Sequence, residues 1–264
     1  MKKILFLTNP TNDSTEEDVF VTEQLKKYYD LVVVHPLQCE QYLDSVQAVV
    51  IRNMWPTYEY LEELKRIKKL IQDSKKPVHN PLCGRGDMEG KDYLIGLYKS
   101  SFPVIPSVDR VEDIGLLPET SLYWIKPKRS CSGYGAEKLS KEELSKRKLA
   151  DYIIQPYIDF VSEPSFFFID NKFSYAIEMP NRLNDRNITL YTPTKEDFVF
   201  AQRFVAWNTL PYGIQRIDAV RTKTGKLLLT EVEDIAEYLY LLDIEVETRD
   251  RVVAELIQSI QNIV

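Results

Sequence analysis

Residues 214–234 have the sequence "IQRIDAVRTKTGKLLLTEVED", in which two apolar segments carry an unexpected set of acids. The segments flank Thr-Lys-Thr-Gly, a pattern typical of a β-hairpin with its turn at 223–226. Strand side chains alternate between the two faces of a sheet, so Glu231 and Glu233 share a face, and the hairpin brings Asp218 opposite Glu231. The sequence therefore predicts three carboxylates gathered on one face of a strand pair.

These three carboxylates need positive charge between them. Like charges opposite each other destabilise a strand pair, and desolvated carboxylates are costly without compensation. An all-oxygen set with no neighbouring His or Cys suits Mg²⁺ or Mn²⁺. We therefore expect Asp218, Glu231 and Glu233 to bind a hard divalent cation. The alternative is a solvated acidic edge of the sheet.

The composition limits the classes of protein that remain. A chain of 264 residues with 44% hydrophobic residues can bury a substantial core, in one unit or in two to three subdomains. The net charge of -6, without a long basic tract, argues against a nucleic-acid partner. No apolar run approaches the roughly 18 residues that a membrane span requires. The apolar segment "YLYLLDI" near the end is either core or a dimer surface, so an oligomer remains open.

The cysteines and histidines indicate the redox compartment and exclude one kind of metal site. The three cysteines are widely spaced with no CxxC, and we find no secretory signal, so we expect a reduced, cytoplasmic protein. The two histidines exclude a multi-histidine metal site.

The first part of the chain alternates between strand and helix patterns, which predicts a small α/β sheet. The predicted strands are 2–8, 30–36, 46–53 and 76–81, and the predicted helices are 14–29 and 57–74. The remainder predicts strands at 121–128 and 151–158, a hairpin at 164–180, and helices at 91–101, 140–148, 192–211 and 248–263. This order suggests three packed subdomains without flexible tethers.

A lysine and the loop that follows it form a candidate phosphate site. Lys126 lies in the apolar strand "LYWIKP", where an unpaired ammonium would be expensive, so we expect it to project toward an anion. Ser130, Ser132, Gly133 and Gly135 follow in a flexible loop that can point backbone N–H groups at phosphates. Ordinary hairpin chemistry explains the same glycines equally well.

Three further cations have two interpretations each. Lys91 starts a predicted helix, where it is a phosphate ligand or a solvated surface charge. Arg216 shares the face of Asp218, so it contacts a transferred phosphoryl group or forms an internal salt bridge with the acids. Arg52, with Trp55, faces a substrate cleft or caps the first sheet.

The order and spacing of five segments resemble the ATP-grasp superfamily over nearly the whole chain. The segments are Lys91, "IKP" at Lys126 with its glycine-containing loop, "IIQPYI" at 153–158, "RID" at 216–218 and "TEVED" at 230–234. The segment "VVIRNMWPTYEYLEEL" at 49–64 is most similar to the glutathione-synthetase-like branch, which includes the cycloserine-forming cyclo-ligase.

This resemblance implies a mixed α/β and α+β fold of three lobes. Residues 1–90 would form a Rossmann-like substrate lobe, 91–150 a small central lobe and 151–264 a strand-rich lobe. The nucleotide would bind between the last two.

The resemblance also assigns roles to the candidate residues. Lys91 and Lys126 would contact the ATP phosphates under the loop 130–135, and Arg216 would steady the transferred group, which makes Arg216 and Lys126 the catalytic candidates. Asp218, Glu231 and Glu233 would hold two Mg²⁺ ions. The remaining nucleotide contacts would come from Gln155, Tyr157 and Ile158 at the adenine and from Glu163 at the ribose or the hinge.

The implied activity is an ATP- and Mg²⁺-dependent ligase that joins a small carboxylate and an amine, amino-acid-like or peptide, through an acyl phosphate. The alternatives are a modifier of a peptide or protein terminus and a non-catalytic nucleotide-binding protein of the same fold. The absence of an identifiable Ser-His-Asp or Cys-His arrangement agrees with this chemistry. This chain has Glu178-Met179-Pro180 where that branch carries Lys-Arg-Pro, and Arg186 would be the substrate-facing arginine. The departure therefore concerns the substrate more than ATP.

Overall fold

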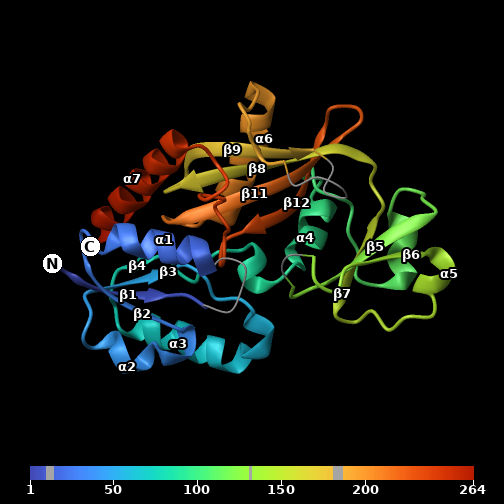
Figure 1. The fold of residues 1–264 in the computed structure, drawn as a ribbon. Helices are drawn as coiled ribbons and strands as arrows, with labels where there is room; N and C mark the ends of the chain where they lie inside the picture. The colour runs from blue at the N-terminus through green and yellow to red at the C-terminus, as the bar shows by residue number, and fades with distance from the viewer. Residues whose placement is uncertain (10–14, 131–132, 181–186) are drawn as a thin grey trace.

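The computed structural model describes residues 1–9, 15–130, 133–180 and 187–264, and these residues form three β-sheets (Figure 1). The strands are β1 (Lys3–Leu7), β2 (Asp30–Val34), β3 (Ala48–Ile51), β4 (Val78–His79), β5 (Leu122–Pro127), β6 (Glu137–Ser140), β7 (Tyr152–Pro156), β8 (Phe160–Ile169), β9 (Lys172–Pro180), β10 (Thr189–Leu190), β11 (Ile214–Thr222) and β12 (Leu227–Glu233). The helices are α1 (Thr15–Leu25), α2 (Glu40–Leu43), α3 (Leu61–Asp73), α4 (Tyr93–Lys99), α5 (Lys141–Leu144), α6 (Lys195–Asn208) and α7 (Val246–Ile263), with short 3₁₀ turns at Pro36–Gln38, Thr57–Glu59, Asp87–Glu89 and Val111–Leu116.

The N-terminal sheet is parallel, with strand order β2-β1-β3-β4. Its inner strand β1 is apolar on both faces, as expected for a parallel sheet that is covered on both sides. Ile4 and Phe6 pack in one core with α1 and α7, and Leu5 and Leu7 pack in another core with α3. The predicted β-α-β pattern is therefore confirmed.

Five predicted helices, at 14–29, 57–74, 91–101, 140–148 and 192–211, are longer than the observed ones. The predicted helix at 57–74 begins at Leu61, because Thr57–Glu59 form a 3₁₀ turn. The predicted helix at 140–148 ends at Leu144, and the charged residues that follow offer no apolar face to hold another turn. The helix predicted at 14–29 ends at Leu25. None of the helices in the described ranges is both long enough and apolar enough to cross a membrane.

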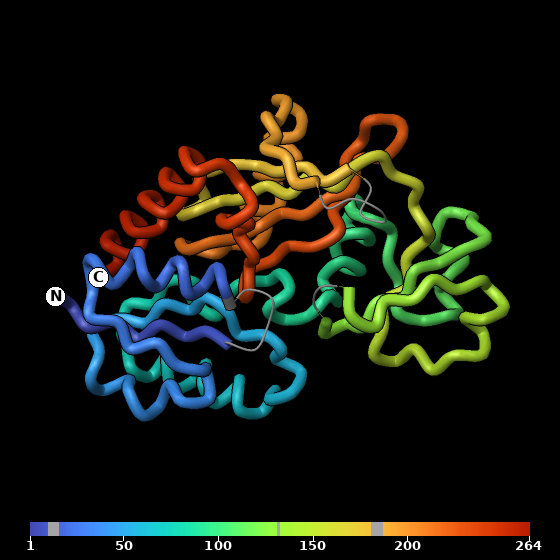
Figure 2. Tube along the Cα trace, viewed as in Figure 1, coloured from blue at the N-terminus to red at the C-terminus, as the bar shows by residue number. Residues whose placement is uncertain are grey.

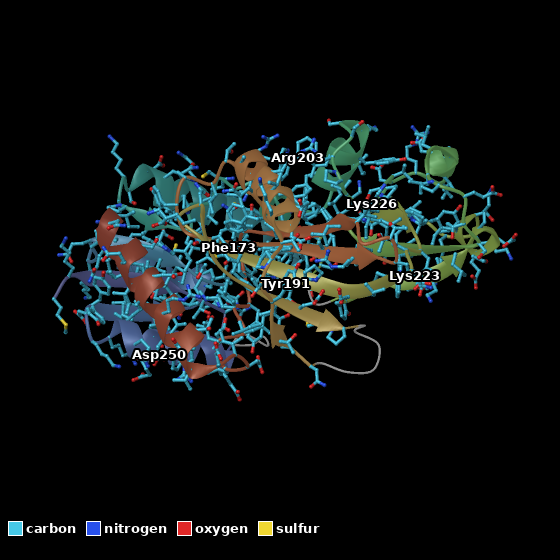
Figure 3. The ribbon with its side chains drawn as sticks, turned by 90° about the horizontal axis from the view of Figure 1, so that it is seen from above. Phe173, Tyr191, Arg203, Lys223, Lys226 and Asp250 are labelled. Atoms are coloured by element: carbon cyan, nitrogen blue, oxygen red, sulfur yellow. The ribbon has the colours of Figure 1, made fainter. Side chains whose placement is uncertain are left out.

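The C-terminal sheet is antiparallel, with strand order β10-β9-β8-β11-β12. Strand β8 carries consecutive aromatic residues that alternate between two cores. Phe166 and Phe168 pack with residues of α6, whereas Phe167 packs with the N-terminal sheet and α7. Phe173 and Tyr191, labelled in Figure 3, pack against the α6 side. The sheet is therefore buried on both faces.

Helix α7 returns the chain to the N-terminal lobe, where it lies beside α1 and brings the two termini close together (Figure 2). Val252, Leu256 and Ile260 of α7 share one core with β1 and α1. The N-terminal and C-terminal sheets are thus joined through a common apolar core.

The central sheet has strand order β6-β5-β7 and packs a small core of its own against α5. Ser140 and Glu143 form a capping box at the start of α5. Strand β7 pairs antiparallel with β5, from Tyr152 to Pro156. The central sheet therefore extends to Pro156, beyond the boundary predicted at residue 150.

A buried histidine of β4, His79, contacts α7 and makes stability depend on pH. His79 donates from Nε2 to Ser259 Oγ at 2.9 Å, since the Ser259 hydroxyl donates to Asp170. Among the described residues its Nδ1 has no hydrogen-bond partner, and burial lowers the pKa of His79 to about 4. Protonation would place an unsatisfied charge in the core.

We therefore expect the free energy of unfolding to fall by up to about 3 kcal/mol as the pH drops from about 6.5 to about 4, because the unfolded chain binds the proton first. Urea unfolding of the protein and of His79→Gln at several pH values would measure this. The difference between the two proteins should shrink across this window, and parallel pH profiles would contradict the prediction.

Candidate functional site

The hairpin of β11 and β12 has the predicted register. Asp218 pairs directly with Glu231, and Arg216 pairs directly with Glu233. Directly paired residues share a face, and residues two apart on one strand do so as well, so all four side chains lie on the same face. The pairing expected from the sequence is therefore confirmed.

The side chains on this face are arranged as ion pairs. Arg216 Nη2 lies 2.8 Å from Asp218 Oδ2 and 2.9 Å from Glu233 Oε1. Glu231 Oε1 lies 3.3 Å from Lys91 Nζ and 4.0 Å from Lys126 Nζ. The internal salt bridge of Arg216, one of the two interpretations of its sequence position, is thus present.

The three carboxylates share one face, but ion pairs engage them separately, so the metal site expected from the sequence remains a prediction. Within the described residues, no three His, Cys, Asp or Glu side chains are grouped to hold a metal ion. The physical reason is that Arg216 draws Asp218 and Glu233 together, while the two lysines draw Glu231 away from them. The donor set nevertheless fits a hard cation chemically, since it consists of carboxylate oxygens on adjacent strands.

Two lysines complete the cluster, and their environments differ. Lys91 is buried at 2% exposure, and its ammonium contacts Asp87 and Glu231. Burial alone would lower its pKa, but the two carboxylates outweigh burial and raise it. Lys126 keeps 22% of its side chain exposed, and burial lowers its pKa despite the attraction of Glu231. Lys126 therefore carries the less compensated charge.

The loop after β5 is shaped by two glycines. Gly133 and Gly135 both have φ of 72°, in the left-handed region that favours glycine. A Cβ at Gly135 would lie 2.8 Å from Pro127 Cγ, so this position also requires the absence of a side chain. Ser130 is buried and donates to Pro127 O at 3.2 Å. Ser132, also predicted to bind phosphate, lies outside the described residues.

The predicted adenine hinge, residues 155–158, begins inside β7 of the central sheet. The Gln155 side chain donates to Ser107 Oγ at 2.9 Å within the interior. The Tyr157 ring lies 4.1 Å from Lys138 Nζ, and its backbone N–H donates to Leu122 O at 2.9 Å. Ile158 follows Tyr157 and is half-buried. The Gln155 side chain is thus committed to a hydrogen bond inside the protein, and the adenine hinge remains a prediction.

Glu163 lies near the hinge end of β8, directly opposite Met179 of β9. Its carboxylate is close enough to Lys126 to raise the pKa of that lysine, against the larger effect of burial. Glu163 is therefore a neighbour of Lys126, the candidate phosphate ligand.

The two tentative substrate arginines have different outcomes. Arg186 lies outside the described residues. Arg52 is 1% exposed, and its guanidinium contacts Glu17, Asp18 and the backbone carbonyl of Glu237. This placement favours the sheet-capping interpretation of Arg52, because its charge is fully engaged inside the protein.

The Glu178 carboxylate, at the position where the sequence departs from the resemblance, lies away from the ion-pair cluster. Glu178 accepts a hydrogen bond from Ser162 Oγ at 2.5 Å and lies 3.7 Å from Arg221. Arg221 in turn binds Asp197 of α6 at 3.1 Å. By strand alternation Glu178 shares the face of Ala176, which packs on the α6 side.

Three residues of this region were not predicted from the sequence: Asp87, Tyr93 and Asp234. Asp87 contacts Lys91, and its Oδ1 accepts from the Tyr93 hydroxyl at 2.8 Å. Asp234 accepts hydrogen bonds from backbone N–H groups of the segment before Lys91. The spacing of four residues between Asp87 and Lys91 was an available signal. No local pattern pointed to Asp234, whose partners lie far away in sequence.

The comparisons with known proteins give structural matches alone. No protein-family profile and no curated protein sequence matches this chain. D-cycloserine synthetase DcsG aligns over 97% of this chain and 99% of its own, with a TM-score of 0.76 and 19% identity. The macrocyclase MdnC from Microcystis aeruginosa MRC, bound to its precursor peptide MdnA, aligns over 97% and 100%, with a TM-score of 0.70 and 12% identity.

A third match carries the fold name. The RiPP-associated ATP-grasp ligase of Chryseobacterium gregarium, in complex with ADP and a leader and core peptide, aligns over 99% of this chain and 97% of its own, with a TM-score of 0.66 and 12% identity. At such identities the likeness lies in the three-dimensional arrangement. The mixed fold predicted from the sequence is confirmed, and this chain has the ATP-grasp fold.

Proposed function

We propose that this protein is an ATP-dependent ligase that joins a carboxylate to an amine-like nucleophile through an acyl phosphate. The observation that carries the proposal is the cluster in which Arg216, Asp218 and Glu231 of the C-terminal hairpin meet Lys91 and Lys126. Such a set of cations and oxygen ligands suits a polyphosphate bound with a divalent cation. The ATP-grasp fold supports the same conclusion.

The proposed reaction has two steps, and each step forms one bond and breaks another. A carboxylate oxygen of the first substrate attacks the γ-phosphorus of ATP, and the bond to the leaving ADP breaks. The nucleophile then attacks the acyl carbon, loses a proton, and displaces phosphate. The carboxylate is a poor electrophile, so phosphorylation supplies the leaving group that the second step requires.

The residues of the cluster have distinct roles in this proposal. Lys126 and Lys91 neutralise phosphate charge, and Arg216 binds the transferred group after releasing part of its salt bridge. Asp218, Glu231 and Glu233 would hold Mg²⁺ or Mn²⁺, which supplies charge neutralisation on the phosphates. The glycine-containing loop and the hinge cover the nucleotide and exclude water from the acyl phosphate.

A second candidate uses the same chemistry on a peptide acceptor. It is favoured by the likeness to MdnC and to the Chryseobacterium gregarium ligase, both solved with peptides. ADP release in the presence of a polypeptide, but not of small carboxylate and amine pairs, would support this candidate. Nucleotide binding without ADP release on any substrate would instead indicate a non-catalytic protein.

Nucleotide binding is the first test. We expect MgATP to raise the unfolding temperature, since a ligand at about 100 times its dissociation constant stabilises the native state by about 2.7 kcal/mol. Asp218→Asn should abolish the metal-dependent part of this shift. The measurement is thermal unfolding with ATP or ADP, with and without Mg²⁺.

The matched control is Asp73→Asn, which removes an exposed aspartate at the end of α3 and should leave the shift intact. If the unaltered protein shows no shift under any of these conditions, the proposed function is wrong. A shift that survives in Asp218→Asn would retain nucleotide binding but remove Asp218 from the metal site.

A further inference from the structure

A buried aspartate outside the ion-pair cluster, Asp234, connects β12, which carries Glu231, to the segment that carries Lys91. Asp234 follows β12 directly and is 0% exposed. Its Oδ2 accepts from Gly86 N and its Oδ1 from Met88 N, both at 2.9 Å. Both oxygens are therefore used to hold residues 84–91, which we call the connecting loop.

The backbone of the connecting loop packs closely against this carboxylate and against β12. A Cβ at Gly84 would overlap the Asp234 carboxylate, and a Cβ at Gly86 would overlap the backbone carbonyl of Val232. The loop is also anchored between these two glycines, because Asn208 Oδ1 accepts from Arg85 N at 2.6 Å. Only a backbone without side chains at 84 and 86 can approach β12 this closely.

The same loop positions a lysine of the cluster. Lys91 ends the loop, and its backbone N–H donates to Lys128 O at 2.8 Å, beyond the end of β5. Its ammonium contacts Asp87 of the loop and lies 3.3 Å from Glu231 of β12. Tyr93 adds a second tie to β12, since its hydroxyl accepts from Val232 N at 2.7 Å and donates to Asp87.

We propose that Asp234 is a positioning residue, which fixes the connecting loop on β12 so that Lys91, Lys126 and Glu231 keep the spacing that a bound polyphosphate requires. The inference rests on the proposed function, because the ligand of Lys91 and Lys126 is taken to be MgATP. Asp234 itself does not contact this ligand. It acts by holding the backbone that carries Lys91 against the strand that carries Glu231.

The test is the affinity for MgATP in Asp234→Asn, measured by isothermal titration. The asparagine amide places a donor against one of the two backbone N–H groups, so one end of the loop is released. Loss of such a supporting contact typically weakens a site by about 10–100-fold, and we expect the dissociation constant to rise within that range.

The matched control is Asp197→Asn. Asp197 is also a buried aspartate that accepts from a backbone N–H, that of Thr194 at 3.1 Å, but it lies at the start of α6. Both variants should unfold at a lower temperature than the unaltered protein. Only Asp234→Asn should weaken MgATP binding, because a purely structural role would lower stability without changing affinity.

A double variant tests whether Asp234 acts through Lys91. In the Lys91→Met background, Asp234→Asn should change the dissociation constant by less than about twofold, since effects that share one path are not additive. If Asp234→Asn does not fold, Gly86→Ala is the substitute variant. Its added Cβ would push the loop away from Val232 of β12 and should weaken binding in the same way.

Three outcomes decide the matter. Weaker binding in Asp234→Asn but not in Asp197→Asn, with no further loss in the Lys91→Met background, supports the inference. Equal affinity in the unaltered protein and in Asp234→Asn, or full additivity with Lys91→Met, overturns it alone. An unaltered protein that does not bind MgATP overturns the proposed function, and this inference with it.

Discussion

Replacing Arg52 with methionine should lower the free energy of unfolding by about 3–5 kcal/mol, the usual result of removing one partner from a buried ion pair. Arg52 is 1% exposed and lies among Glu17, Asp18 and Glu237, which come from α1 and from the segment after β12. Without the guanidinium, these acids remain buried with no positive charge among them. Chemical denaturation at pH 7 measures the loss.

The loss should depend on pH in a defined direction. Burial raises the pKa of Glu17 and of Glu237, and Arg52 opposes that rise. In Arg52→Met both pKa values rise further, so the folded variant takes up protons more readily as the pH falls. The destabilisation relative to the unaltered protein should therefore be smaller at pH 5 than at pH 8.

The control is Arg251→Met, which removes the exposed pair that Arg251 forms with Glu255 on α7. Such pairs contribute at most about 1 kcal/mol. A loss in Arg52→Met no larger than in Arg251→Met would show that Arg52 does not join the N-terminal lobe to the segment after β12.

Replacing Lys126 with methionine should weaken MgATP binding by about 100-fold while leaving the stability of the free protein unchanged or higher. Hydrogen bonds to charged groups contribute roughly 1.5–3 kcal/mol, and the ammonium is expected to form one with a phosphate. In the free protein the same ammonium is poorly compensated, since burial lowers the pKa of Lys126 and Glu231 lies 4.0 Å away. Binding and stability should therefore move in opposite directions.

Lys91→Met is the matched comparison for this prediction. Its ammonium contacts two buried carboxylates, Asp87 and Glu231, which together raise the pKa of Lys91 against the effect of burial. Removing this charge should reduce both stability and affinity. Titration calorimetry and denaturation of the two variants measure both quantities. A Lys126→Met variant that is clearly destabilised, or that binds MgATP normally, would contradict the assignment of Lys126 as a phosphate ligand.

Several features of the molecule follow from local sequence alone. The period-two alternation and the turn at 223–226 set the hairpin register, and Asp218 does lie opposite Glu231. The apolar strand around Lys126 predicted a lysine that projects toward an anion, and its ammonium lies 4.0 Å from Glu231 Oε1. The strand and helix patterns of the first lobe were sufficient for the parallel sheet. The hairpin register depends on neighbours within one hairpin, and the parallel sheet follows from the alternation of strand and helix patterns along the first lobe.

The partners of the charged residues were decided by the tertiary structure. Sequence spacing could not show whether Arg216 faces a ligand or an acid, nor that Arg52 lies buried among acids from two lobes. The hydrogen bonds that Gly86 N and Met88 N donate to Asp234 join residues almost 150 positions apart in the chain. Local periodicity fixes which face of a strand a side chain occupies. Which distant segment packs on that face depends on how the lobes close over their shared cores, and that closure selected the partners of Arg52 and Asp234.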